Sequence, residues 1–282
     1  MIMEFWYRFI SILPFDWAQP GQFFFMKNAL LAIILISPLF SILSTMVVAK
    51  RMSFFSDALG HSAFTGIAIG ILLGWVKPVF LAVVFSILFA FVITLVGQKT
   101  KQSKDTLIGV FSSIAVSLGI LLSTWGGKSF TKLNQYLIGD ILSITSADLN
   151  SLFIILLFVL IIWWILYNPL LVVSVNTDFA ISRGVRSIWI EFIFSALLAI
   201  TVTLTISWIG LLVINSMLVL PAAASRNISL NSRQYHRWAY IISVFSGIAG
   251  LLVSYYLGSS TGATIVLLQG TLFLITYFFR RR

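Results

Sequence analysis

The chain is dominated by long apolar stretches that are separated by short polar segments. A stretch of about 20 apolar residues is long enough to cross the hydrocarbon core of a bilayer as a helix. Composition agrees, because 60% of the 282 residues are hydrophobic and only 9% are charged, whereas roughly 25% of the residues in a soluble chain are charged. The sequence therefore predicts an all-α polytopic membrane protein and not a soluble domain.

Eight or nine transmembrane helices are predicted, and nine is the working number. The segment 133–146 is too short to cross the membrane and is the candidate for a re-entrant helix. Residues 1–24 are rich in Trp and Phe and are expected to form an external interfacial segment, whereas residues 25–282 form a single transmembrane domain. The predicted spans lie near 25–48, 58–75, 78–97, 107–124, 149–167, 188–207, 210–224, 238–257 and 262–279.

The 18 basic residues outnumber the eight acidic ones, which gives a net charge of +10. Such an excess is found in nucleic-acid-binding proteins, but also in the short cytoplasmic loops of membrane proteins. In the predicted topology 13 of the 18 basic residues fall on one side of the membrane. The asymmetry predicts an external N-terminus and a cytoplasmic C-terminus, and it gives no reason to expect a nucleic-acid partner. The basic segments on the cytoplasmic side are 50–51, 99–104, 183–186, 226–237 and 280–282.

Asp57 and His61 are the most informative ionisable residues near an apolar segment. Their i,i+4 spacing places a carboxylate and an imidazole on one face of a helix, close enough to bind one cation. Because the chain has no cysteine, such a site would use nitrogen and oxygen ligands, which suit reversible binding of zinc, manganese or iron. The alternative is structural: Asp57 would cap the second span and His61 would hydrogen-bond to another helix. The residues alone leave both interpretations open.

The other ionisable residues favour structural roles. Glu191 is expected to reach the membrane interface or to pair with an arginine. His236 lies between Arg233 and Arg237 and is expected to face solvent or lipid. The sequence has no phosphate-binding loop, no His-Glu-x-x-His pattern and no nucleophile elbow. The chain is therefore not expected to be an enzyme.

Several sequence blocks resemble the zinc and manganese permease family of ABC importers. The first block, RMSFFSDALGHS at 51–62, is followed by the glycine-spaced TGIAIGILLG at 65–74. The resemblance covers most of the chain from about residue 25, although Lys50 stands where arginine is usual in the family. The further blocks are DTLIGV at 105–110, YLIGDILSITSADL at 136–149, WIGLLVINSMLVLPAAASR at 208–226 and TGATIVLLQ at 261–269.

The resemblance implies that residues 25–282 are a permease domain with the architecture of the vitamin B12 and siderophore importers. In such systems a homodimer forms the pore in a bacterial-type plasma (inner) membrane and is surrounded by lipid. An external metal-binding protein delivers the ion, and two cytoplasmic ATP-binding subunits hydrolyse ATP. The chain would hold no permanent cofactor, and its transported ion would be Zn²⁺ or Mn²⁺.

The resemblance also assigns residues. Asp57 and His61 belong to the metal pathway, and Asn215 and Ser216 are candidates for additional ligands. The Gly139-Asp140 pattern and the arginine at 226 resemble the zinc branch, so zinc is favoured and manganese or iron is the alternative. An ATPase-independent channel or secondary transporter is a further alternative, and an intramembrane metalloenzyme would need a third ligand. The ATPase contacts are expected in 222–237 and 176–186, at Ala223, Ala224, Ser225, Arg226, Asn227, Arg233, Asp178 and Gly184.

Overall fold

A computed structural model describes residues 2–12, 15–19, 23–75, 78–100, 102–125 and 139–279. Within these residues the fold is helical and contains no strand. Nine helices in the described part of the chain are long and apolar enough to cross a membrane, which confirms the nine predicted spans. They are α2 (Phe24–Ala49), α3 (Phe55–Leu72), α4 (Pro78–Lys99), α5 (Lys104–Trp125), α7 (Ser146–Val175), α9 (Ser187–Ile209), α10 (Leu211–Ile228), α11 (Ser232–Leu257) and α12 (Thr261–Phe278).

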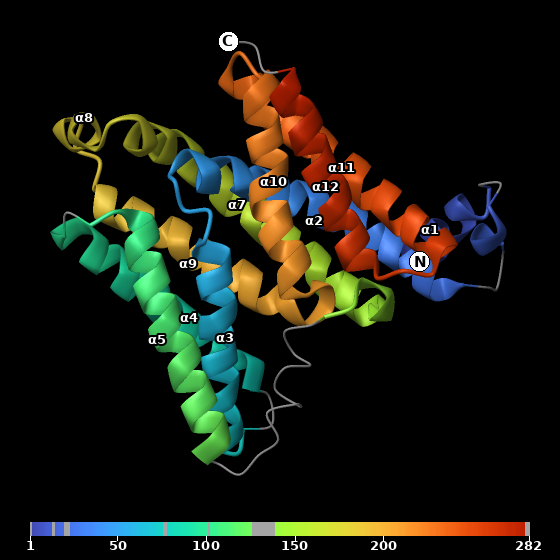
Figure 1. The fold of residues 1–282 in the computed structure, drawn as a ribbon, viewed down its shortest axis with the longest axis horizontal. Helices are drawn as coiled ribbons and strands as arrows, with labels where there is room; N and C mark the ends of the chain where they lie inside the picture. The colour runs from blue at the N-terminus through green and yellow to red at the C-terminus, as the bar shows by residue number, and fades with distance from the viewer. Residues whose placement is uncertain are drawn as a thin grey trace.

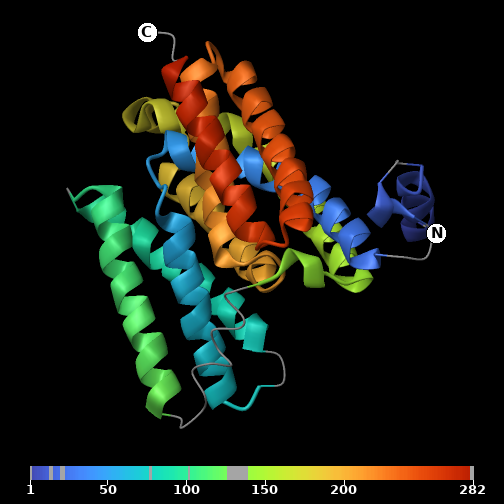
Figure 2. The same ribbon diagram turned by 45° about the vertical axis from the view of Figure 1, so that its right-hand side comes forward.

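The long helices form two groups that are joined by α9. Helix α3 packs against α4 and α5, while α2 packs against α7, α10 and α11, and α12 packs against α10 and α11. Helix α9 contacts both groups, because it packs against α3, α4 and α7. Figures 1 and 2 show the α3–α5 group as a lobe beside and below the other helices. The first turns of α3 lie near the middle of the molecule, where the two groups meet (Figure 1).

Small and hydroxyl-bearing residues bring α3, α4 and α9 together. The Ser86 hydroxyl on α4 lies 2.9 Å from the Ser62 hydroxyl on α3 and accepts a 3.0 Å hydrogen bond from Thr203 on α9. Gly66 on α3 faces the backbone of Ala82 so closely that a Cβ atom would overlap it. Close backbone approach and hydroxyl contacts are the usual means by which membrane helices associate. The glycine-spaced block of α3 therefore serves packing.

We expect Gly66→Ala to destabilise the protein, because its added methyl group meets the Ala82 backbone, which cannot move as a side-chain end can. Overpacking of this kind costs about 1–3 kcal/mol. The matched control is Gly270→Ala on α12, where the added methyl group would meet no atom within 4 Å and the lost glycine flexibility should stabilise the helix by roughly 0.5–1 kcal/mol. Thermal unfolding in detergent measures both variants. Equal midpoints for the parent and Gly66→Ala would contradict this account of α3.

The break between α9 and α10 occurs at Gly210, whose φ of 85° and ψ of 151° are accessible essentially to glycine alone. The helix that follows runs through Pro221 to Ile228, four residues beyond the predicted span. Proline removes one backbone donor from the helix, and neighbouring helices in a membrane protein tolerate this loss. The sharp break thus lies at the glycine and not at the proline.

Residues outside the long helices form short elements. Helix α1 (Ile2–Ile10) and the 3-10 helix η1 (Asp16–Ala18) precede α2, and the Trp6 indole donates a 3.0 Å hydrogen bond to the Lys27 carbonyl on α2. Of the candidate re-entrant segment, residues 133–138 lie outside the described residues. Residues 139–146 hold only the 3-10 helix η2 (Ile141–Ser143) and the start of α7. The re-entrant helix and the interfacial role of residues 1–24 stay predictions.

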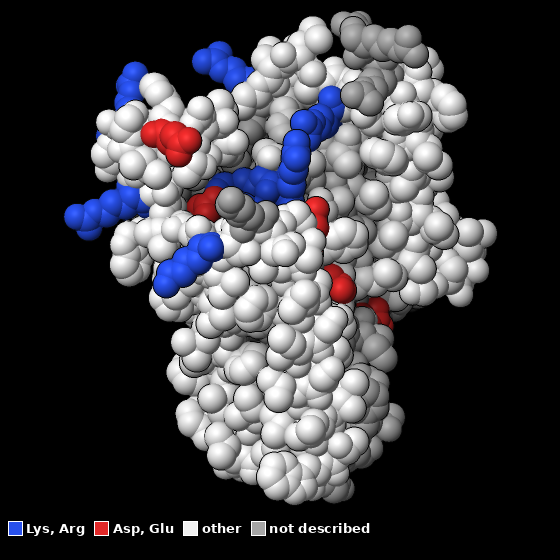
Figure 3. Space-filling view, turned by 60° about the vertical axis from the view of Figure 1, so that its left-hand side comes forward, with Lys and Arg blue, Asp and Glu red and all other residues white. Residues whose placement is uncertain are grey.

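Basic side chains gather toward one end of the molecule, whereas the other end of the same face is uncharged among the described residues (Figure 3). The short helix α8 (Thr177–Ser182) lies at the upper end in Figure 1, together with the link between α10 and α11 and the C-terminus. Among the described residues, the charges on this face are therefore concentrated at one end. The orientation of the chain in the membrane stays a prediction.

Candidate metal site on helix α3

The first turn of α3 carries both residues of the predicted pair. The helix follows a turn at 50–54 in which Arg51 has a φ of 56°, an uncommon value for a residue other than glycine. Phe54 occupies the N-cap position, and no side chain caps the helix there. Asp57 lies inside the first turn of the helix. The structural alternative in which Asp57 caps the second span is therefore wrong.

Asp57 and His61 do share one face of α3. The His61 Nε2 atom lies 3.4 Å from the Asp57 Oδ2 atom. Both side chains are partly open to the surroundings, with 46% of the Asp57 side chain and 28% of the His61 side chain exposed. A carboxylate and an imidazole at this separation form an N/O pair that a divalent transition metal could join.

Helix α10 contributes Asn215 to this pair. The Asn215 Nδ2 atom donates a 3.0 Å hydrogen bond to the Asp57 Oδ1 atom, and the Asn215 Oδ1 atom is buried without a hydrogen-bond partner among the described residues. Gly60 faces the Leu211 side chain at the start of α10, whose terminal methyl groups would have to shift to admit a Cβ atom there. An amide offers a donor on one side and an acceptor on the other. Asn215 can therefore orient Asp57 and, after rotation of its amide, present an oxygen to a cation.

Ser216 does not join the pair in the described structure. Its hydroxyl donates a 2.8 Å hydrogen bond to the Val213 carbonyl on its own helix, and only 7% of the residue is exposed. A serine whose hydroxyl bonds back to the preceding turn is typical of an ordinary helix interior. Its geometry gives no support to the prediction of Ser216 as a metal ligand.

The surroundings of Asp57 are open on the side of α5. Asp57 and Phe54 line a surface hollow of about 390 Å³ together with Asp105 and Gly109 of α5. No group of three or more His, Cys, Asp or Glu side chains close enough to hold a metal occurs within the described ranges. Two ligands and a nearby amide fit a site that binds a cation briefly and releases it.

The segment 176–186 contains the short helix α8, whose residues are exposed except for the buried Ala180. The Asn176 side chain caps it by accepting a 3.0 Å hydrogen bond from the Phe179 N–H group, and Gly184 follows it with a φ of 77°. Phe179 and Ile181 are 50% and 55% exposed. Asp178 is also exposed. The helix thus presents apolar and acidic side chains outward at the basic end of the molecule.

The second predicted ATPase contact, 222–237, consists of the end of α10, a short link and the start of α11. Ala224 and Ser225 are buried, and the Ser225 hydroxyl donates a 2.7 Å hydrogen bond to the Tyr235 carbonyl. Arg226 and Arg233 are exposed, whereas Ala223 and Asn227 are partly buried. The accessible part of this segment is therefore formed mainly by its arginines and the apolar Leu230.

Two features escaped prediction. Glu191 pairs with Lys50 and Lys104 and not with an arginine. His236 is only partly exposed: its Nε2 atom is buried, and its ring centroid lies 5.4 Å from that of Tyr167 and 6.3 Å from that of Trp163. Partners that lie many residues apart in sequence leave no local signal, so neither arrangement is visible in the residues that flank Glu191 or His236.

The sequence profile of the ABC 3 transport family matches residues 22–280. The chain belongs to this family. Among its relatives, the high-affinity zinc uptake system membrane protein ZnuB of Haemophilus influenzae is 33% identical over 257 residues, which cover 90% of this chain and 97% of the relative. The manganese transport system membrane protein MntC of Halalkalibacterium halodurans is 28% identical, with 96% of this chain and 92% of the relative covered.

Solved structures agree with this assignment. PsaBC from Streptococcus pneumoniae, determined in complex with a Fab, contains a chain that matches with a TM-score of 0.76 and 26% identity, covering 99% of this chain and 96% of that chain. A metal-chelate type ABC transporter in an inward-facing conformation matches with a TM-score of 0.65 at 14% identity, covering 89% and 85% of the two chains. The latter shows similarity of fold alone. The predicted importer-type permease architecture is confirmed.

Proposed function

We propose that this chain is the permease subunit of an ATP-driven ABC importer for divalent transition metal ions, with zinc as the first candidate. The observation that carries the proposal is the Asp57–His61 pair, which combines nitrogen and oxygen ligands at 3.4 Å on a partly exposed face of α3. Ionisable side chains within membrane spans tend to face a polar pathway or a partner. Membership of the ABC 3 transport family supports transport as that pathway.

In this proposal the pore forms between two copies of the chain, and the partly exposed Asp57 and His61 face it. An external metal-binding protein delivers the ion, and Asp57 and His61 hold it transiently while Asn215 steadies the carboxylate. Partial exposure of the pair supports this arrangement, because a second copy could complete a site that holds only two strong ligands here. The transported metal is substrate, and the chain itself needs no resident cofactor.

Zinc is the first candidate for the transported ion because of the sequence identity of the relatives. Imidazole and carboxylate bind both zinc and manganese, and selectivity among such ions often rests on geometry and availability. The zinc uptake protein of Haemophilus influenzae is 33% identical to this chain and the manganese protein of Halalkalibacterium halodurans is 28% identical. Manganese and iron are therefore competitors to be tested directly.

The basic end of the molecule faces the cytoplasm in this proposal, which places the N-terminus outside and the C-terminus inside a bacterial-type plasma (inner) membrane. Two ATP-binding subunits then meet α8 and the accessible arginines of 222–237. The exposed apolar Phe179 and Ile181 support the contact at α8, since exposed apolar residues at the end of a membrane domain are suited to a protein partner. ATP hydrolysis belongs to those subunits.

The test is metal uptake into proteoliposomes that contain the chain with its ATP-binding subunits and external binding protein. We expect uptake of radioactive zinc only when ATP is supplied, and stronger competition by unlabelled zinc than by manganese or iron. Liposomes with the chain alone are the control. ATP-independent flux through the chain alone would reject the importer in favour of a channel or secondary transporter. Stronger competition by manganese than by zinc would retain the importer and change its ion.

A further inference from the structure

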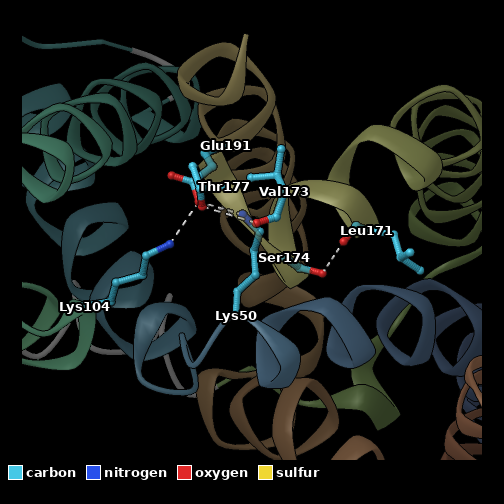
Figure 4. A network of polar contacts seen from close by, with 7 residues as sticks. All are labelled: Lys50, Lys104, Leu171, Val173, Ser174, Thr177 and Glu191. Atoms are coloured by element: carbon cyan, nitrogen blue, oxygen red, sulfur yellow. Dashed lines mark hydrogen bonds and ion pairs between the residues drawn. The ribbon is translucent and has the colours of Figure 1, made fainter. Parts of the chain in front are cut away.

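Two lysines from separate parts of the chain bind the same carboxylate oxygen of Glu191. The Oε1 atom of Glu191 on α9 accepts hydrogen bonds from Lys50 Nζ at 2.7 Å and from Lys104 Nζ at 3.0 Å. Lys50 directly follows α2, and Lys104 is the first residue of α5. Figure 4 shows the two lysines reaching Glu191 from different sides. The Glu191 carboxylate thus joins α9 to the α3–α5 group at two places, which are the turn before α3 and the start of α5.

The two ion pairs differ in burial. The Lys50 side chain is 3% exposed and that of Glu191 is 18% exposed, whereas that of Lys104 is 44% exposed. Glu191 and both lysines line a cavity of about 30 Å³ with apolar neighbours that include Met52 and Phe194. Burial lowers the pKa of Lys50, and the Glu191 carboxylate beside it acts in the opposite direction. A buried pair resists separation far more than an exposed one, because separation leaves a charge without a partner.

The two residues of the buried Lys50–Glu191 pair lie close in sequence to α3 and to α8, respectively. Glu191 lies four residues after the start of α9, and α8 ends at Ser182, only five residues before that start. Helix α8 also packs against α9. On the other side, Lys50 begins the short turn that leads into α3, with Asp57 seven residues further on. The Lys50–Glu191 contact is therefore a direct side-chain link between α9, the helix next to α8, and the turn that leads to Asp57 and His61.

We propose that Glu191 is a positioning residue that couples α8 to the Asp57–His61 site through Lys50. The inference rests on the proposed function, in which the ATP-binding subunits act on α8. Movement of α8 shifts the first turns of α9, and the buried ion pair carries that shift to the turn before α3. The site would then change its orientation or access in step with ATP hydrolysis. An ion pair with only a structural role would hold the helices together without affecting how ATP hydrolysis is coupled to transport.

The experiment compares zinc transported with ATP hydrolysed, using the purified complex in proteoliposomes. Glu191→Gln should lower zinc uptake per ATP by at least about tenfold, the size of a typical coupling free energy between sites. Lys104→Gln is the matched control, because it removes an exposed pair with the same carboxylate and should change the ratio by less than about twofold. Lys50→Arg retains the buried charge and donor, so it should keep most of the coupling.

Glu191→Gln leaves a buried lysine without its partner and could lower the amount of folded protein. The double variant Lys50→Met with Glu191→Met removes this problem, because apolar side chains of similar length often replace a buried ion pair without loss of stability. Coupling predicts that the double variant folds, hydrolyses ATP and still transports little zinc per ATP. If the double variant transports as much zinc per ATP as the parent, the proposal is overturned and the ion pair has only a structural role. Absence of ATP-driven uptake of zinc, manganese and iron by the parent complex would reject the proposed function, and the coupling role with it.

Discussion

Replacing His61 with alanine is expected to lower zinc uptake by more than about 100-fold, beyond the effect of a residue that only supports a metal ligand. His61 is the one imidazole beside Asp57 among the described residues, at 3.4 Å, so its removal leaves a carboxylate and an amide for a cation that prefers nitrogen ligands. Uptake of radioactive zinc by cells that rely on this importer measures the effect. Membrane levels of the chain and ATP hydrolysis by the complex should stay close to those of the parent.

The matched control for His61→Ala is Ser216→Ala on α10. Its hydroxyl bonds only to the Val213 carbonyl among the described contacts, so its loss should cost about 1 kcal/mol of stability or less and leave uptake within about twofold. Normal uptake by His61→Ala would remove His61 from the pathway. Loss of uptake by Ser216→Ala at normal protein levels would restore the serine as a ligand candidate.

Replacing Phe179 with glutamate is expected to detach the ATP-binding subunits. Phe179 is 50% exposed on α8, and a buried aromatic residue at the centre of an interface often contributes about 2 kcal/mol or more to binding, which corresponds to a loss of affinity of more than tenfold. Copurification of the ATP-binding subunits with the tagged permease measures this contact. Zinc uptake should fall in parallel, since hydrolysis can no longer drive the pore.

Leu73→Glu is the control for Phe179→Glu. Leu73 directly follows α3 and is 64% exposed. The end of α3 lies at the opposite end of the molecule from α8 in Figure 1, so an added carboxylate there should leave copurification unchanged. Leu230→Glu examines the segment between α10 and α11 in the same assay. If Phe179→Glu retains its partner while Leu230→Glu loses it, the ATPase contact lies at 222–237 and not at α8.

Periodic and compositional features of the sequence predicted the fold well. Apolar stretches have to lie across the membrane, so the nine spans follow from length and hydropathy, and the Asp57–His61 spacing fixes a shared helix face whatever the neighbours are. The predicted spans 188–207 and 210–224 also placed a break next to Gly210, whose observed backbone conformation essentially only glycine accepts.

Contacts between segments that are distant in the chain could not be predicted from the sequence. Lys50 and Glu191 are 141 residues apart, and Asn215 and Asp57 are 158 residues apart, so no local pattern reports that they meet. The sequence around Gly60 does not show that this glycine lies against Leu211 of α10. The residues alone also do not distinguish Asn215 from Ser216, whose hydroxyl bonds to its own helix. The residues of a membrane site come from several helices, and only packing decides which of them point together.

The central claim is that Asp57 and His61 hold the transported ion. The most direct measurement is anomalous X-ray scattering at the zinc edge from crystals of the permease complex soaked in zinc. We expect an anomalous peak at roughly 2.0–2.2 Å from the His61 imidazole and the Asp57 carboxylate, the ordinary lengths of zinc bonds to nitrogen and oxygen. Zinc density elsewhere in the membrane domain, with none at Asp57 and His61 in a complex that transports zinc, would contradict the claim.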